Sequence, residues 1–164
     1  MATAYSKIQR NFWETDEARE MTPEEKYFWM YLQTNANVNT LGCYAFRMRK
    51  AMDETGYNRE TLEKLLQRME QVLRILYDEG TKEVFLLHWA EGNWNKKTAT
   101  LRALAADLKE IQSKTLKETV KTLLLKNGIF TEEEVEKAEK TAPSAQERNE
   151  KEQRGTTGNK RSGE

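Results

Sequence analysis

Residues 47–89 read RMRKAMDETGYNRETLEKLLQRMEQVLRILYDEGTKEVFLLHW, and their hydrophobic spacing changes part-way from a helical to an extended period. The first part predicts a helix from about Arg47 to Thr55, which Gly56 ends in the left-handed conformation that only glycine adopts cheaply. Asn58 then caps a second helix. Apolar residues at helical spacing predict that one face of this helix is buried: Leu62, Leu65, Leu66, Met69, Val72 and Leu73.

The second part of the stretch predicts a β-hairpin. Arg74–Tyr77 is apolar and β-prone, Asp78–Thr81 is a turn, and Val84–Trp89 is apolar again. A short strand is expected at Gly42–Phe46, before the first of the two helices.

Another helix precedes this stretch. Thr22 and Glu25 match a capping box, and Pro23 between them is tolerated in a first helical turn. The polar run at residues 35–39 ends the helix. Four residues at helical spacing give it an aromatic face that we expect in the core: Tyr27, Phe28, Tyr31 and Leu32. The order helix, strand, helix, turn, helix, hairpin is that of a winged helix-turn-helix domain, which we place at residues 21–96.

Helical spacing returns afterwards and predicts a helical extension over residues 97–140. The step from Ile111 to Leu116 indicates a break near Gln112, with Ser113 as the cap of the next helix. Thr131 opens a last short helix.

The two ends of the chain differ in composition from the middle. Residues 141–164 contain no large apolar residue, so we expect a disordered charged tail. Residues 1–20 are expected to be a leader, whose Phe12 and Trp13 pack against the first helix or a partner subunit. The predicted class is mainly α with a small β-hairpin (α+β): a winged helix-turn-helix followed by C-terminal helices and a disordered tail.

Charge and cysteine content exclude several classes of protein. The 27 Lys and Arg residues balance 27 Asp and Glu residues, so no overall field draws the chain to nucleic acid and binding needs a local patch. Cys43 is the only cysteine, which excludes an intramolecular disulfide framework and a cysteine-rich zinc site. Without an apolar run of roughly 18 residues or a secretory signal, the chain is expected to be soluble and cytoplasmic, with no membrane partner.

The second helix of a helix-turn-helix enters the major groove with its N-terminal residues near base edges. Here Arg59 is suited to guanine and Gln67 to adenine, whereas Lys64 is suited to phosphate. The preceding helix and the hairpin add further cations. The full set of expected DNA-binding residues is Asn58, Arg59, Lys64, Gln67, Arg68, Arg47, Arg49, Lys50 and Lys82.

Two carboxylates support a different interpretation of the same face. Glu60 and Glu63 would repel phosphates, as expected if these are ordinary solvated helix positions and the domain binds protein instead of DNA. Both interpretations stay open at this point.

A second basic run lies at Lys114, Lys117 and Lys121, which share one helical face. It is either a solvated face or a further nucleic-acid contact, to which Lys109 and Lys126 add basic character. The opposite apolar face packs on the winged helix or joins another copy of the chain: Leu116, Val120, Leu123 and Leu124.

The sequence does not predict an enzyme. It has no phosphate-binding GxxxxGK[ST] loop, and the only histidine, His88, lies in the apolar segment of the predicted hairpin. The acidic run from Glu132 to Glu134 is typical of a helix start. We therefore expect no catalytic residues, no metal and no cofactor.

Several short segments resemble one family in their order and spacing. They are FWETD at residues 12–16, MTPEEKYF at 21–28, YLQTN at 31–35, GCY at 42–44, ETGY at 54–57 and NW at 93–94. Together they resemble the N-terminal domain of DnaD-type and phage replisome-organiser proteins, over about residues 8–96.

The resemblance implies a winged-helix protein that binds double-stranded DNA at replication origins, helps to recruit the helicase loader and often forms homo-oligomers. It also implies a phage or prophage of Gram-positive bacteria as the source. The family commonly has a larger C-terminal domain, whereas about 45 residues lie here between the hairpin and the predicted tail. Transcriptional regulation by the same domain is the nearest alternative, since a winged helix does not record the process it serves.

Overall fold

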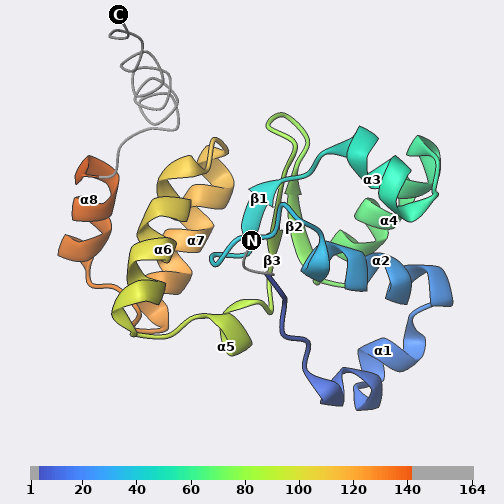
Figure 1. Cartoon of the computed structure of the whole chain (residues 1–164), viewed down its shortest axis with the longest axis horizontal. Coiled ribbons are helices and arrows are strands. Elements are labelled where there is room, and N and C mark those ends of the chain that lie inside the picture. Colours follow the sequence, from blue (N-terminus) through green and yellow to red (C-terminus); the bar gives the residue numbers. More distant parts are fainter. Residues whose placement is uncertain (1–3, 142–164) are drawn as a thin grey trace, which may run out of the picture.

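The structure is a computed structural model that describes residues 4–141 (Figure 1). Helices surround a small central sheet, which confirms the expected mainly α class with a β-hairpin. The predicted tail lies outside the described residues apart from Thr141, the last residue of a helix. In chain order the elements are the 3-10 helix η1 (Arg10–Glu14), α1 (Asp16–Glu20), α2 (Pro23–Thr34), β1 (Cys43–Ala45), α3 (Met48–Thr55), α4 (Arg59–Gln71), β2 (Ile75–Asp78), β3 (Glu83–Leu86), α5 (Ala90–Asn93), α6 (Thr98–Glu110), α7 (Lys114–Lys126) and α8 (Glu132–Thr141).

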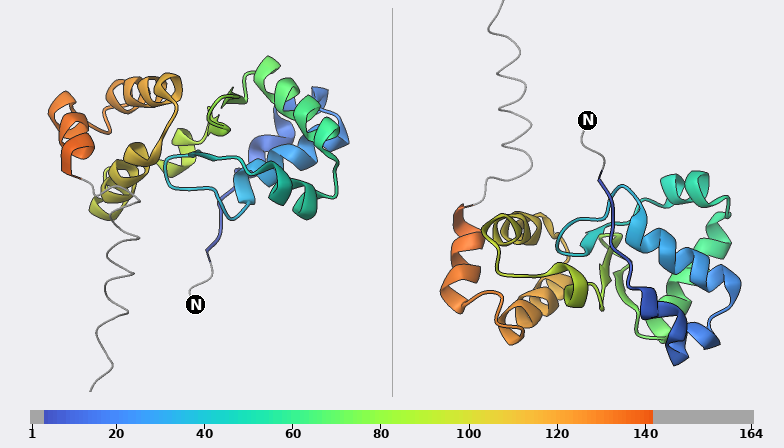
Figure 2. Two further views of the ribbon diagram at one scale, coloured as in Figure 1. Left: turned by 90° about the horizontal axis from the view of Figure 1, so that it is seen from above. Right: turned by 60° about the horizontal axis from the view of Figure 1, so that its bottom comes forward.

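The three strands form one antiparallel sheet in the order β1-β3-β2. Val84 in the central strand lies opposite Tyr44 of β1 on one side and Tyr77 of β2 on the other. Helices α2, α3 and α4 gather on one side of this sheet (Figures 1 and 2). The order α2, β1, α3, α4, β2, β3 is that of a winged helix-turn-helix, as the sequence predicts.

Local capping confirms the predicted helix ends. Thr22 and Glu25 form the capping box of α2, with N–O distances of 3.2 and 3.1 Å. Gly56 ends α3 with a φ of 79°. The side-chain oxygen of Asn58 accepts the backbone N–H of Thr61 at 2.9 Å and so caps α4. The α3–α4 turn is therefore fixed by residues within itself.

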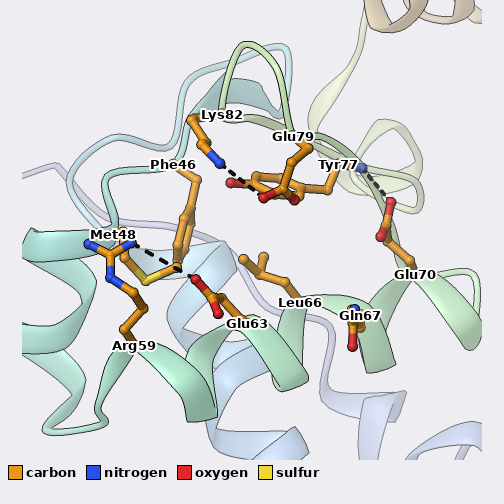
Figure 3. Close-up of a pocket in the computed structure, with 10 residues that line it drawn as sticks. All are labelled: Phe46, Met48, Arg59, Glu63, Leu66, Gln67, Glu70, Tyr77, Glu79 and Lys82. Carbon is orange, nitrogen blue, oxygen red and sulfur yellow. Dashed lines mark hydrogen bonds and ion pairs between the residues drawn. The ribbon is translucent and has the colours of Figure 1, made fainter.

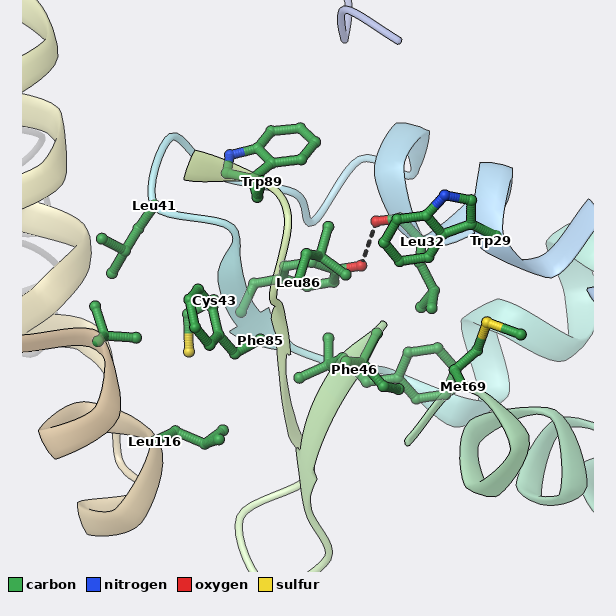
Figure 4. Close-up of a cluster of buried hydrophobic side chains, with 14 of the residues drawn as sticks. Trp29, Leu32, Leu41, Cys43, Phe46, Met69, Phe85, Leu86, Trp89 and Leu116 are labelled. Atoms are coloured by element: carbon green, nitrogen blue, oxygen red, sulfur yellow. Dashed lines mark hydrogen bonds between the residues drawn. The ribbon is translucent and has the colours of Figure 1, made fainter. Parts of the chain in front are cut away.

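The sheet is buried on both faces, because α6 and α7 lie on the side opposite α2–α4 (Figure 2). All four residues of β3 are buried. The buried apolar side chains form one cluster that crosses the sheet (Figure 4). On the α2–α4 side it includes Leu32, Phe46 and Met69, and on the α7 side Cys43, Phe85 and Leu116.

The C-terminal helices bury their apolar face within the same chain. Leu116, Val120 and Leu124 of α7 are all buried, and Leu123 is half-buried. Of the two alternatives for this face, packing on the winged helix is the one that the structure adopts. The last helix buries Val135 and packs against α6.

A buried carboxylate joins the hairpin to the start of α7. Glu83 of β3 accepts backbone N–H groups from Gln112, at 3.0 and 3.1 Å to its two oxygens, and from Ser113 at 2.6 Å. The Ser113 hydroxyl donates to Asp78, and the Ser113 oxygen caps α7 by accepting the N–H of Leu116 at 3.1 Å. The hydrogen bond from Ser113 holds the pKa of Asp78 below its usual value. Free N–H groups at a helix start favour such negative partners.

The predicted apolar face of α4 is wrong at its end. Leu73 is 67% exposed, and α4 stops at Gln71. Leu73 takes a φ of 54° in a turn where the N–H of Arg74 reaches the carbonyl of Met69 at 2.9 Å. This is the Schellman geometry that closes many helices, and it points the side chain at position 73 outward.

The predicted second hairpin strand is too long. β3 ends at Leu86, so His88 and Trp89 lie in a turn. The Trp89 indole N–H donates to the backbone carbonyl of Thr40 at 3.0 Å. His88 is half exposed, with Nδ1 3.5 Å from Glu91, and is not part of an apolar strand.

Two aromatic residues are exposed: Trp13, expected against the first helix or a partner subunit, and Tyr27, expected in the core. Trp13 is 60% exposed, with the Lys26 ammonium 5.9 Å from its ring centre, whereas neighbouring Phe12 is buried as expected. Tyr27 is 47% exposed and meets Tyr57 edge to face. The segment expected to be a leader contains η1 and α1.

Two glycines with positive φ allow the cost of backbone strain to be measured separately from the cost of overpacking. Gly42 has a φ of 78°, and an added Cβ would overlap the Trp89 indole, whereas Gly56 has a φ of 79° with nothing within 4 Å. Gly56→Ala is expected to lower the free energy of unfolding by about 1 kcal/mol, from backbone strain alone. Gly42→Ala should lower the free energy of unfolding by about 3 kcal/mol or more, because its added methyl group also overpacks against the Trp89 indole. Urea denaturation measures both, and equal losses would contradict the close approach of Trp89.

The role of Glu83 is tested by Glu83→Gln. An amide keeps the size of the side chain but presents N–H donors to N–H groups, so we expect a loss of about 2 kcal/mol in unfolding free energy. Glu79→Gln is the control, because the side chain of Glu79 is 82% exposed at the hairpin tip and should change stability by less than about 0.5 kcal/mol. Similar values for the two variants would show that Glu83 does not anchor α7.

Candidate nucleic-acid interface

The outward face of α4 carries three of the nine predicted DNA-binding residues. Arg59, Lys64 and Gln67 are all exposed on this helix. Arg59 and Gln67 border the groove between α4 and the hairpin (Figure 3). Asn58 was predicted to take part in DNA binding, but its side-chain oxygen accepts the hydrogen bond that caps α4. The face therefore begins at Arg59.

Each cation of this face lies beside a carboxylate one turn away. Arg59 Nη1 is 3.9 Å from Glu63 Oε1, and Lys64 Nζ is 2.8 Å from Glu60 Oε1. The hydrogen bond with Glu60 raises the pKa of Lys64, and the same bond lowers the pKa of Glu60. These pairs are solvent-exposed, so they cost little to break, but they leave the face close to neutral.

Arg68 is directed away from the DNA-reading face. Its Nε lies 2.9 Å from Oε1 of Glu25, a buried residue at the start of α2. Glu25 also accepts the backbone N–H of Thr22 in the capping box of α2. The ion pair thus joins α4 to α2, and Arg68 has a structural partner that the sequence analysis did not anticipate.

The start of α3 holds the least neutralised cations of the set. Arg47 and Arg49 are exposed, and their side chains make no hydrogen bond or ion pair within residues 4–141. Lys50, one residue on, lies 3.5 Å from Glu54. Phosphates prefer unpaired guanidinium groups, so Arg47 and Arg49 are the strongest candidates for phosphate contact in the predicted set.

The hairpin tip lies next to these arginines. The Phe46 N–H donates to the carbonyl of Lys82 at 2.8 Å, which places Arg47 beside the tip. Lys82 has a φ of 57°, and its Nζ lies 3.0 Å from Glu79 Oε1. The fold therefore brings Arg47, Lys82 and the face of α4 to one end of the winged helix.

A groove of about 240 Å³ separates α4 from the hairpin (Figure 3). Its apolar side chains are Phe46, Met48, Leu66 and Tyr77, and its charged and polar ones are Arg59, Glu63, Gln67, Glu70, Glu79 and Lys82. Burial and the surrounding carboxylates, Glu79 first, raise the pKa of Tyr77 to about 12. The groove was not predicted from the sequence, although the aromatic Tyr77 next to the predicted turn at Asp78–Thr81 was a signal for it.

The second basic run does not form one nucleic-acid face. Lys121 Nζ lies 2.6 Å from Glu139 of α8 and 3.1 Å from Glu118, and Lys117 lies 4.0 Å from Glu139. The bond with Glu139 raises the pKa of Lys121. These two lysines hold α8 against α7, and Lys114 alone of the three is exposed.

Other kinds of site find no support in the described part of the chain. Among residues 4–141 no group of three or more His, Cys, Asp or Glu side chains could hold a metal ion. Within the same range no helix is long and apolar enough to cross a membrane. Comparisons with models of protein families, with curated proteins and with solved structures find no match to this chain.

The contrast between Arg68 and Arg59 can be measured. Arg68→Ala is expected to lower the free energy of unfolding by about 1–2 kcal/mol, because it leaves the buried Glu25 carboxylate without its charged partner. Arg59→Ala removes only an exposed pair and should change stability by less than about 0.5 kcal/mol. Urea denaturation of both variants measures this difference. If Arg68→Ala left the free energy of unfolding unchanged, Arg68 would again be a candidate for DNA contact.

Proposed function

We propose that this chain binds double-stranded DNA through its winged helix and serves in the initiation of DNA replication, as a replisome organiser or an origin-binding accessory factor. One observation carries the DNA-binding part: the exposed face of α4 lies at the same end as Arg47 and the hairpin tip at Lys82. An exposed helix with cations of the preceding helix and of the hairpin tip beside it matches the way helix-turn-helix domains enter the major groove.

Each residue of this end then has a distinct role. Arg59 and Gln67 face the base edges, since guanidinium and amide groups pair with guanine and adenine. Arg47, Arg49, Lys64 and Lys82 hold phosphates, and Lys50 lies at the margin beside Glu54. Asn58 and Arg68 act indirectly, by capping α4 and by fixing it to α2.

The replication role rests on the resemblance of residues 8–96 to DnaD-type and phage replisome-organiser proteins. It brings with it the proposed partners, which are helicase-loading proteins and further copies of the same chain, and a cytoplasmic location. Transcriptional regulation would use the same face. Mapping bound DNA on the source genome separates the two, because an origin supports replication and a promoter supports regulation.

A second candidate function is a protein-interaction or oligomerisation module that binds no DNA. The observation in its favour is the carboxylate beside each cation of α4 and of the hairpin tip. This alternative predicts stable self-association, measured by light scattering, and no change in fluorescence anisotropy when labelled DNA is titrated at low salt.

The DNA proposal is tested by fluorescence-anisotropy titration with duplex and single-stranded DNA at about 50 and 200 mM salt. Four phosphate contacts predict a slope near −3.5 in log affinity against log salt, or about a 100-fold weakening over this range. Arg59→Ala combined with Lys64→Ala should lower duplex affinity by about tenfold and reduce the slope by about one.

The matched control is Lys96→Ala combined with Lys97→Ala, which removes two exposed lysines from the segment before α6. This control should bind duplex as the unaltered protein does. Absence of duplex binding at the lower salt would overturn the proposal, and equal affinities for the two double variants would remove α4 from the interface.

A further inference from the structure

The groove between α4 and the hairpin has the shape of a side-chain receptor. Phe46 and Leu66 are buried at its base, and Met48 and Tyr77 are half-buried beside them (Figure 3). The volume of about 240 Å³ admits one or two side chains but not a helix. An apolar base of this kind favours an apolar or aliphatic segment of a ligand.

The charge of the groove favours a cation. Glu63 lies on the α4 wall and Glu79 on the hairpin wall, and Glu70 of α4 also lines the groove while it accepts the backbone N–H of Tyr77 at 3.0 Å. The two cations present, Arg59 and Lys82, each lie beside a carboxylate of their own wall, at 3.9 and 3.0 Å. Three carboxylates against two cations leave an excess of negative charge inside the groove.

The same carboxylates act on the hydroxyl of Tyr77, which lines the groove. Its pKa is raised by burial first and then by Glu79, Glu63 and Glu70, which disfavour a phenolate at this position. A phosphate would meet the same repulsion, whereas a cation would be attracted. The groove and the outward face of α4 therefore differ in the ligand that each prefers.

An arginine side chain matches these features better than a lysine does. Its planar guanidinium has five N–H donors for carboxylates on two walls, and it stacks on aromatic rings such as that of the half-buried Tyr77. Its aliphatic stem also suits the apolar base. We propose that this groove is a docking site for an arginine side chain of a partner protein, with a neighbouring apolar residue of that partner packed on Leu66.

The evidence for this site does not depend on the DNA proposal, although the two sites share residues. The two ligands would meet at Arg59 and Lys82. A bound guanidinium competes for Glu63 and Glu79 and so releases both cations for phosphate. Occupation of the groove is therefore expected to strengthen DNA binding, not to block it.

The test uses the full chain with 13C-labelled methionine methyl groups and no DNA. The probe is the peptide acetyl-Leu-Arg-Gly-Arg-Leu-amide, titrated to about 5 mM, and the comparison peptide has Glu in both Arg positions. The Met48 methyl resonance should shift and saturate with the arginine peptide only. The methyl of Met69 is fully buried in the core and should stay in place.

Glu63→Gln combined with Glu79→Gln should weaken the arginine peptide about fivefold, since two partly exposed charge pairs are lost. Glu20→Gln combined with Glu110→Gln removes two exposed carboxylates elsewhere and should bind as the unaltered protein does. An unchanged Met69 resonance in each variant shows that the fold is kept.

The inference is overturned by any of three results: no Met48 shift at the highest concentration, an equal shift with the glutamate peptide, or unaltered affinity in the groove variant. Because the titration contains no DNA, a failed DNA experiment leaves this result standing. Conversely, if the chain bound duplex DNA in a salt-sensitive way but the Met48 methyl resonance did not shift with the arginine peptide, only the docking site would be refuted.

Discussion

The buried carboxylate of Glu83 is the interaction on which the arrangement of the chain depends. It lies on the central strand, so it is fixed by β1 on one side and by β2 on the other. From there it accepts the backbone N–H groups of Gln112 and Ser113 just before α7, and it thereby holds the C-terminal helices on the face of the sheet opposite α2–α4. A carboxylate in this position is stable only because it is hydrogen-bonded, since a buried unpaired charge is expensive. The hairpin is consequently not a free arm: its residues are packed from both sides, and the tip at Lys82 has a fixed place relative to Arg47.

This rigidity shapes the electrostatics of the proposed interface. A neutral chain cannot attract DNA over a long range, so affinity must come from a few positioned cations. Arg47 and Arg49 are the ones without a carboxylate among the described residues, while α4 presents alternating charges. Under the DNA-binding proposal, such a face is expected to bind weakly as a single copy, and several linked copies on one DNA would multiply the affinity. The negative groove beside it gives the same end of the molecule a second type of ligand.

Local features were predictable from the sequence because their partners are three or four residues away. The capping box at Thr22, the glycine turn at Gly56 and the cap at Ser113 are of this kind. The partners of Arg68, Glu83 and Lys121 lie 43, 29 to 30 and 18 residues away, and hydrophobic spacing contains no information about them. For the same reason the sequence placed Lys117 and Lys121 on an open basic face, whereas the fold supplies Glu139. The DNA-binding role of the α4 face and the likeness to DnaD-type proteins stay predictions.

The main-chain character of the Glu83 contacts has an evolutionary consequence. The carboxylate binds N–H groups that every residue except proline possesses, so the side chain at position 112 is free to change while the hydrogen bond persists. The number of residues between α6 and α7 is constrained instead, because one insertion would carry the N–H of Ser113 away from its acceptor. Among relatives of this chain, drift in residue identity and strict conservation of loop length should therefore occur together at this corner, and proline should be absent at positions 112 and 113.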